Sequence, residues 1–258
     1  MKIKRIIYCL YFMEGYFFLS RNFRLQKVGD LDWLNNNFEF DLNSNFIDEL
    51  MVVLVKDKPT NDDFEEYFKN VEKLRKNIFI PLILGGGITT VELSKRFFDN
   101  GADKILINSS AYKSKKIVNE IADYFGSQAI SIGIDYKRNG QKIELYSNCG
   151  KILENTEFKT HLENLENMNC GEIIINSIDN DGNGAGLDLE ITSLIKKNFS
   201  KPMLLMGGAG KPEHFSKGLQ IDIISGIVSA NLFNFLGSGL KNVRTRLAKD
   251  KINIAKFE

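Results

Sequence analysis

The sequence predicts a single α/β barrel with eight parallel strands, and three observations support this fold class. Short runs rich in Ile, Val and Leu alternate with helix-like segments, which is the pattern of parallel strands buried on both faces. The chain has 258 residues, the usual length of one eightfold barrel. Two glycine-rich runs recur at corresponding strands. We therefore expect one domain over residues 1–258.

Eight apolar runs define the predicted strands. They cover residues 5–11, 47–55, 81–87, 104–108, 129–135, 172–179, 202–208 and 221–227. Along the fifth run, period-two alternation places Ser131, Gly133 and Asp135 on one face and the isoleucines between them on the other. The small residues should face the barrel interior, and the isoleucines should pack against the surrounding helices.

The helices predicted most clearly between these strands cover residues 61–77, 89–100, 113–124, 156–169 and 188–198. Thr89 and Glu92 have the spacing of a capping box. Segments 12–30 and 136–153 are longer than a tight connection, and both follow strands. We expect them to cover the carboxyl ends of the strands, where α/β barrels place their active sites.

The two glycine runs, GGG at 85–87 and GGAG at 207–210, each end a strand. Glycine lets backbone N–H groups approach an anion that a Cβ atom would block. We therefore expect two pseudo-symmetric half-barrels, each with a site for a phosphate of a small-molecule ligand; the alternative is that the glycines only make tight turns. The predicted phosphate contacts are Gly86, Gly87, Asn108, Ser109, Gly182, Gly207, Gly208, Ala230 and Asn231.

Charge and cysteine content exclude several classes of protein. Lys and Arg number 34 against 33 Asp and Glu, so no overall field favours nucleic acid or an anionic membrane. No apolar stretch approaches the ~20 residues that span a bilayer, and the first run is a strand rather than a signal peptide. Three cysteines without paired spacing indicate reduced thiols in the cytoplasm. The two histidines lack metal-ligand spacing, and we expect neither a metal nor a cofactor.

Carboxylates end two of the predicted strands. Asp135 closes the IGID run and is followed by Tyr, Lys and Arg, which makes it the best candidate for general acid/base work. The alternative is a cap, because Asp is common in turns. Asp179 and Asp181 in the SIDNDG run orient a polyhydroxy ligand or organise their own loop.

Four charged residues begin predicted strands at the opposite end of the barrel: Arg5, Glu49, Lys104 and Glu172. Alternation places them on faces that point into the barrel. Two cations and two anions can neutralise one another in a ring, which is the condition for burying charge. Otherwise they are ordinary solvated residues at strand starts.

Several motifs are similar, in wording and order, to those of the HisF family, the cyclase subunits of imidazole glycerol phosphate synthase. The matching segments are KRIIYCL at 4–10, GGGI at 85–88, GADKILINS at 101–109, FGSQA at 125–129, GEIIINSIDNDG at 171–182 and GGAGKPEHF at 207–215. The resemblance implies a TIM-type (β/α)8 barrel that receives ammonia from a HisH-like glutaminase docked on its amino-terminal face. It also implies that the four strand-start charges form an ammonia gate and that Asp135 is one of two catalytic aspartates.

The chain departs from this family at the first strand. Tyr11 stands where the family has its other catalytic aspartate in a CLD motif, Leu19 replaces a lysine of the mobile lid, and Leu54 replaces an aspartate. Tyrosine has an unperturbed pKa of about 10, against about 3.9 for aspartate, and cannot be an anionic base near neutral pH. Because general acid/base steps contribute about 10²–10⁴-fold, Tyr11 counts against the conventional cyclase reaction.

The histidine-biosynthetic enzymes usually have threonine at the position of Asn176. With asparagine there, the chain resembles a divergent HisF-like branch. That branch works with a HisH-like glutaminase and a sugar amidotransferase to convert an acetamido group of a surface sugar into acetamidino. Asn176, Asp179 and Asp181 would then orient the substrate. The prediction is an ammonia-channelling subunit for this amidotransfer. The alternatives are the conventional cyclase, which converts PRFAR and ammonia into imidazole glycerol phosphate and AICAR in histidine biosynthesis, and a non-catalytic phosphate-binding barrel.

Overall fold

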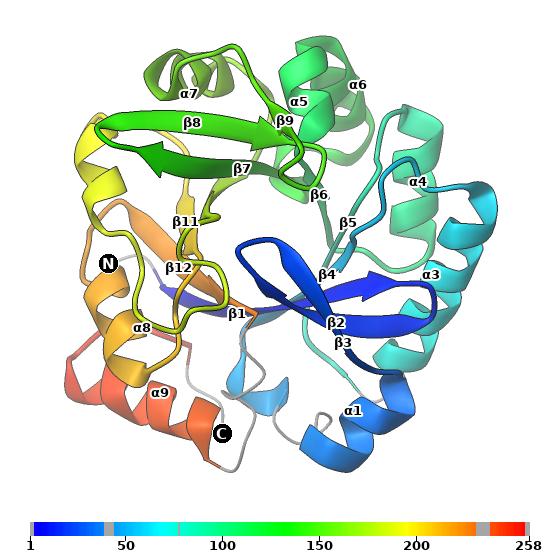
Figure 1. The fold of residues 1–258 in the computed structure, drawn as a ribbon, viewed down its shortest axis with the longest axis horizontal. Helices are drawn as coiled ribbons and strands as arrows, with labels where there is room; N and C mark the ends of the chain where they lie inside the picture. Colours follow the sequence, from blue (N-terminus) through cyan, green and yellow to red (C-terminus); the bar gives the residue numbers. More distant parts are fainter. Residues whose placement is uncertain (1–2, 39–43, 77, 231–237, 256–258) are drawn as a thin grey trace.

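The fold is a closed barrel of eight parallel strands surrounded by helices (Figure 1), in a computed structural model that describes residues 3–38, 44–76, 78–230 and 238–255. Pairing of β12 with β1 and of β7 with β10 closes the sheet. The barrel strands, in order around the sheet, are β1 (Arg5–Met13), β4 (Glu49–Leu54), β5 (Leu82–Gly85), β6 (Lys104–Ile107), β7 (Ile130–Asn139), β10 (Glu172–Ser177), β11 (Met203–Met206) and β12 (Ile224–Ser229). The predicted TIM-type fold is confirmed.

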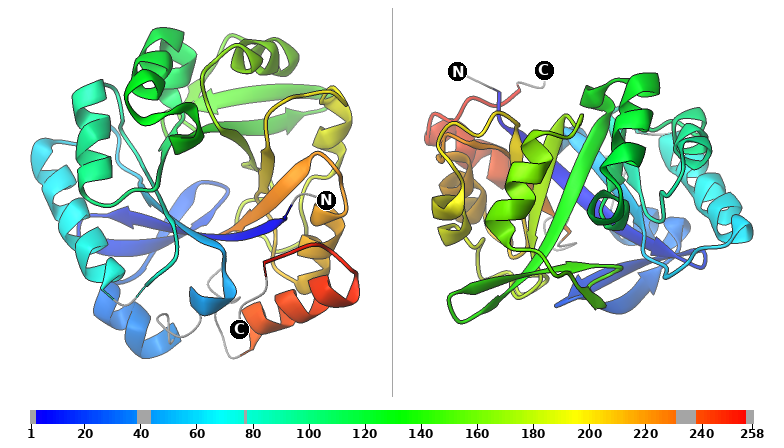
Figure 2. Two further views of the ribbon diagram at one scale, coloured as in Figure 1. Left: turned by 180° about the vertical axis from the view of Figure 1, so that it is seen from behind. Right: turned by 90° about the horizontal axis from the view of Figure 1, so that it is seen from above.

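The helices lie outside the sheet, as both views in Figure 2 show. They are α1 (Leu31–Phe38), α3 (Asn61–Arg75), α4 (Val91–Asp99), α5 (Ser109–Lys113), α6 (Lys115–Phe125), α7 (Phe158–Glu166), α8 (Pro212–Leu219) and α9 (Gly239–Lys249), with short 3-10 turns η1 (Ser44–Phe46), η2 (Ser127–Ala129) and η3 (Glu190–Leu194). Their apolar faces pack on the outward side chains of the strands. Tyr67 of α3, for example, is fully buried and donates a hydrogen bond to the Val52 carbonyl of β4 at 2.7 Å.

Three helix predictions need correction. The segment predicted as helix 188–198 forms only η3, because Ile191, Thr192 and Ser193 are poor helix formers in succession. Helix 113–124 is interrupted at Ser114, whose backbone is extended and separates α5 from α6. The cap of α4 is Thr90 rather than Thr89, since its hydroxyl accepts the N–H of Leu93 at 3.1 Å.

Each of the two long segments after β1 and β7 forms antiparallel strands beyond the barrel. The first is a hairpin of β2 (Tyr16–Arg21) and β3 (Arg24–Gly29), and the second contains β8 (Lys142–Ser147) and β9 (Ile152–Leu153). Figure 1 looks onto this end, which we call the mouth, and shows the β2–β3 hairpin crossing it. In the right view of Figure 2 the start of β1 lies at the opposite end, which we call the bottom face.

The barrel interior, or lumen, is filled by a second apolar cluster that is separate from the core under the helices. Its buried members come from β1, β4, β5, β10, β11 and β12: Ile7, Cys9, Tyr11, Met51, Ile83, Ile174, Leu204, Met206 and Val228. Alternation along each strand therefore sorts side chains between lumen and helices as the sequence predicts. Of the helices in the described ranges, none combines the length and the apolar composition needed to traverse a bilayer.

Candidate functional site

The four strand-start charges meet at the bottom of the lumen and form a closed ring. Arg5 Nη1 lies 2.6 Å from Glu49 Oε1, and Arg5 Nη2 lies 2.7 Å from Glu172 Oε2. Lys104 Nζ lies 3.0 Å from Glu49 Oε1 and 3.2 Å from Glu172 Oε1. Both glutamates are buried, with 7 % and 4 % of their surface exposed, so the residues are not ordinary solvated charges. Their role as an ammonia gate stays a prediction.

Ser131 joins this ring, and sequence reasoning did not assign it a role. Its fully buried hydroxyl donates to Glu172 Oε1 at 2.6 Å. Burial alone would raise the pKa of Glu172, but Arg5, Lys104 and the Ser131 hydroxyl together hold that pKa below its usual value. Alternation had placed Ser131 on the lumen face, which was the available signal. Glu172 is consequently ionised at neutral pH.

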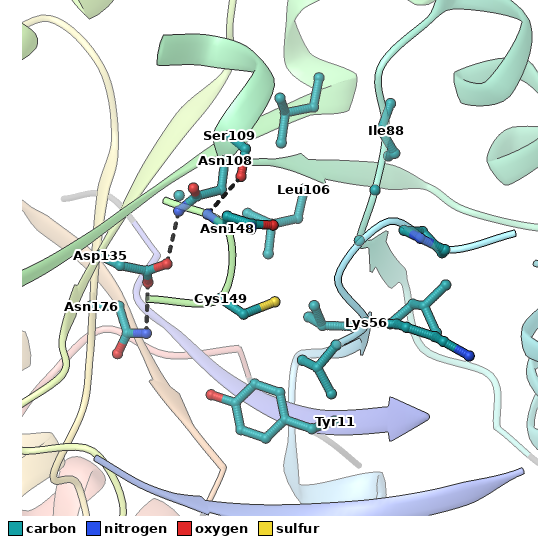
Figure 3. A pocket seen from close by; sticks show the side chains of 18 of the residues that line it. Tyr11, Lys56, Ile88, Leu106, Asn108, Ser109, Asp135, Asn148, Cys149 and Asn176 are labelled. Atoms are coloured by element: carbon teal, nitrogen blue, oxygen red, sulfur yellow. Dashed lines mark hydrogen bonds between the residues drawn. The ribbon is translucent and has the colours of Figure 1, made fainter. Parts of the chain in front are cut away.

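Asp135 lies at the mouth, at the end of the lumen opposite the ring. Asn108 Nδ2 donates to its Oδ2 at 2.9 Å, and Asn176 Nδ2 donates to its Oδ1 at 2.9 Å (Figure 3). Burial raises the pKa of Asp135 to about 7, against the lowering effect of the two amide donors. A carboxyl group with that pKa exchanges its proton near neutral pH, which is the property that a general acid or base needs.

Tyr11 reaches the same cavity from β1, and its side chain is only 8 % exposed. Burial first, and then the neighbouring Cys9, Asp181 and Asp135, raise the pKa of the phenol well above 10. The hydroxyl therefore stays protonated at neutral pH and is no anionic base. The hydroxyl is buried and interacts with the thiol of Cys9.

The cavity at the mouth has a volume of about 310 Å³ and brings together one predicted phosphate set. Gly86, Gly87, Asn108 and Ser109 all border it, as do the cations Lys56, Lys58 and Lys113, which the sequence had not indicated. The side-chain oxygens of Asn108 and Asn176 are buried without a partner among the described residues. Several polar groups thus converge on a mainly apolar space, as in a small-molecule site.

Gly86 is required by the backbone itself, whatever it binds. Its φ is +111°, and a Cβ atom there would lie 2.2 Å from the carbonyl oxygen of Leu54. Gly140 also has positive φ, at +60°, but no atom within 4 Å of a Cβ. A side chain at Gly140 would meet only the strain of a positive φ, whereas one at Gly86 would also clash with the backbone. Substitutions at the two positions therefore distinguish the two costs.

We expect Gly86→Ala to lower the free energy of unfolding by about 3 kcal/mol, because strain and overpacking add. Gly140→Ala should lower it by about 1 kcal/mol, through strain alone. Urea unfolding followed by circular dichroism measures both. Equal losses in the two variants would contradict the close approach at Gly86.

The second predicted phosphate set does not line this cavity. Gly207 and Gly208 have φ values of +98° and +94°, and the Gly208 carbonyl accepts the N–H of Gly186 at 2.9 Å. Gly182 packs closely on the backbone of Ser20. Ala230 contacts the lumen cluster, and Asn231 lies outside the described residues. A second phosphate site stays a prediction.

The contacts of Asp179 and Asp181 favour the loop-organising interpretation. Asp179 Oδ2 accepts the backbone N–H of Arg138 at 2.7 Å, and Asp181 Oδ2 accepts that of Phe23 at 3.1 Å as well as the hydroxyl of Ser20. Neither aspartate lines the mouth cavity, whereas Asn176 does. These carboxylates fix the two mouth hairpins to the segment after β10.

The chain is similar in sequence to proteins of known families. The family described as "Histidine biosynthesis protein" matches residues 38–237. A Parasynechococcus marenigrum protein provisionally named imidazole glycerol phosphate synthase subunit hisF2 is 34 % identical over all of this chain and 95 % of its own length. The imidazole glycerol phosphate synthase subunit HisF of Chlorobium phaeobacteroides is 32 % identical over 98 % of this chain and 99 % of its own. The HisF of Sulfurisphaera tokodaii is 34 % identical over 86 % and 87 %, respectively. The chain therefore belongs to the histidine biosynthesis protein family, as a HisF member of it.

Proposed function

We propose that this chain is the ammonia-conducting subunit of a synthase, which docks a HisH-like glutaminase on its bottom face and passes ammonia through the barrel to the mouth. The observation that carries the proposal is the closed ring of Arg5, Glu49, Lys104 and Glu172 below an apolar lumen and an acid/base group. Burying charges is costly even when they are paired. A buried ring of four charges at one end of the lumen therefore supports a role other than stabilising the fold.

The composition of the lumen supports passage of neutral ammonia rather than ammonium. Between the ring and the mouth, its walls are aliphatic side chains, methionines and Cys9. An isolated cation is strongly disfavoured in such surroundings, whereas a small neutral molecule is not. Ammonia released below the ring would thus stay unprotonated until it reached Asp135.

Exposed apolar side chains support docking at the bottom face. Ile3, Phe79 and Tyr124 are 59 %, 93 % and 76 % exposed, and they precede the amino ends of β1, β5 and β7. Large aromatic side chains are typical anchors of protein interfaces. A glutaminase seated here would cover them and face the ring.

Tyr11 and Asn176 determine which acceptor we propose for the ammonia. With a phenol in place of the family's aspartate, the mouth lacks one of the two expected carboxylates, and this favours amidotransfer to the acetamido group of a surface sugar by a separate amidotransferase. The conventional cyclase reaction of PRFAR is the second candidate. It is favoured by Asp135, whose pKa of about 7 suits acid/base chemistry.

The test is co-expression with a HisH-like glutaminase. We expect a stable complex and a glutaminase rate raised about 5–150-fold by this chain, the usual range of coupling between sites. Lys104→Met should reduce that coupling and lower the free energy of unfolding by about 2 kcal/mol, because it leaves two buried carboxylates sharing Arg5.

Lys217→Met, at an exposed position of α8, is the matched control and should change neither quantity. If the proteins do not associate and the glutaminase is not stimulated, the proposal is wrong. A barrel that only bound phosphate would be indifferent to Lys104→Met.

A further inference from the structure

Neighbouring strands β7 and β10 connect the ring to the mouth by three rows of lumen-facing residues. Their register pairs Ser131 with Glu172, Gly133 with Ile174, and Asp135 with Asn176. Rows two residues apart are separated by roughly 6–7 Å along a strand. One row therefore belongs to the ring, one to the middle of the lumen, and one to the mouth.

The contact of the ring that costs least to break is the one between Ser131 and Glu172. Elsewhere the ring consists of charged pairs between Arg5 or Lys104 and the two glutamates, and parting such a pair leaves buried charge uncompensated. Ser131 contributes only a neutral hydroxyl to Glu172. That hydroxyl can exchange its bond to Glu172 for one to ammonia, because it both donates and accepts. Glu172 would keep its two cations meanwhile.

Above Ser131, the next lumen-facing position on β7 has no side chain. A Cβ atom at Gly133 would make ordinary van der Waals contacts, at 3.4 Å with Leu106 Cδ1 and 3.6 Å with Asn108 Nδ2, so the glycine leaves free a volume about the size of one methyl group. The mouth cavity extends down to Gly133 and Ile174, while no ring residue lines it. On the other strands the middle of the lumen is filled by larger side chains, including Met51, Ile83 and Val228.

We propose that ammonia crosses the ring beside Ser131 and moves along β7 past Gly133 to Asp135. Ser131 is then a positioning residue, whose hydroxyl forms a hydrogen bond with ammonia as it crosses the ring. This inference rests on the proposed conduction of ammonia and specifies its route. The passage is off-centre, against one wall of the barrel, and its polar ends are Ser131 and Asp135. The intervening row offers no hydrogen bond, which favours transfer of the neutral molecule.

Krypton, a small apolar atom, probes the middle of this route in crystals of the whole chain under pressure. We expect krypton density between Gly133, Ile174 and Leu106. Gly133→Val should abolish it, and Val228→Ile, which adds bulk on the wall formed by β12, should leave it in place. Density against Met51, Ile83 or Val228 with none beside Gly133 would overturn the route.

Transfer itself is tested in the complex with the glutaminase, using the Tyr11→Asp chain, PRFAR as acceptor, and either glutamine or ammonium salt. Ser131→Val should lower glutamine-driven turnover by about tenfold and leave ammonium-driven turnover unchanged. Ser131→Thr, which keeps the hydroxyl, should restore most of the glutamine-driven rate.

Equal losses with both nitrogen sources, or no loss, would overturn the role of Ser131. If glutamine drives no turnover in any variant although ammonium does, the proposed partnership fails instead. The krypton experiment decides the route in either case, because it requires neither a partner nor turnover.

Discussion

Tyr11→Asp is expected to raise ammonium-driven turnover of PRFAR by about 10²–10⁴-fold, the usual contribution of one acid/base group. The substitution places a carboxylate at the carboxyl end of β1, on the cavity that Asp135 faces. The phenol cannot serve there, because its pKa lies well above 10. The measurement is product formation by the purified chain in ammonium salt, without a glutaminase.

Tyr11→Asn is the matched control for this experiment, because it has nearly the size of aspartate but no charge. It should leave turnover as low as in the natural chain. If the natural chain already converts PRFAR as fast as Tyr11→Asp, the conventional cyclase reaction is the function and Tyr11 does not block it. If neither converts it, the further substitutions at Leu19 and Leu54 are the next to be reversed.

Asp135→Asn is expected to abolish acid/base chemistry and, at the same time, to stabilise the fold at alkaline pH. In the Tyr11→Asp protein, the additional Asp135→Asn substitution should lower ammonium-driven turnover of PRFAR by about 10²–10⁴-fold. The stability effect follows from burial, which raises the pKa of Asp135 to about 7 in the folded chain, against about 3.9 in an unfolded one. Asparagine carries no charge to bury.

The sign of this effect depends on pH. Between pH 4 and pH 7 the folded chain holds a proton on Asp135 that the unfolded chain has lost, so stability falls as pH rises through this range. The gain from Asp135→Asn should be near zero below pH 4 and reach about 4 kcal/mol above pH 7, at about 1.4 kcal/mol per pKa unit. Urea unfolding of both proteins at pH 5 and pH 8 measures it.

Asp123→Asn, at an exposed position of α6, is the control and should show no pH-dependent gain. If the gain in stability of Asp135→Asn over the natural protein is no larger at pH 8 than at pH 5, the carboxylate is not penalised by burial. The interpretation of Asp135 as a group poised near neutral pH would then be wrong.

The barrel could be predicted because a parallel strand buried on both faces leaves a continuous apolar run. Each of the eight predicted strands overlaps an observed one. The hairpins beyond β1 and β7 were expected only as long loops. Asn22 and Phe23, which turn β2 into β3 with φ of 50° and 62°, are not the glycines that signal such a turn, whereas Asn139 and Gly140, at the turn from β7 to β8, are such a signal and were not used. The segment predicted as helix 188–198 forms only η3. There, weak local helix propensity outweighs the expectation that a helix follows each strand.

The site was predictable where one strand determines it and not where several elements meet. Alternation predicted the lumen position of Asp135, but its two amide donors, Asn108 and Asn176, come from neighbouring strands. Asp181 and Ser20 are 161 residues apart, and their contact depends on where a hairpin folds over the mouth. Lys58 and Lys113 likewise carry no local signal of the cavity they share.

The fastening of the β2–β3 hairpin has a consequence for binding kinetics. Its tip is held to the segment after β10 by the Ser20 hydroxyl and the Phe23 N–H on Asp181, and by Asn22, whose side chain donates to the carbonyls of Ile178 and Asp179. A ligand too large for the remaining opening must wait for these bonds to break. Association then has a unimolecular opening step, and its observed rate reaches a plateau as ligand concentration increases.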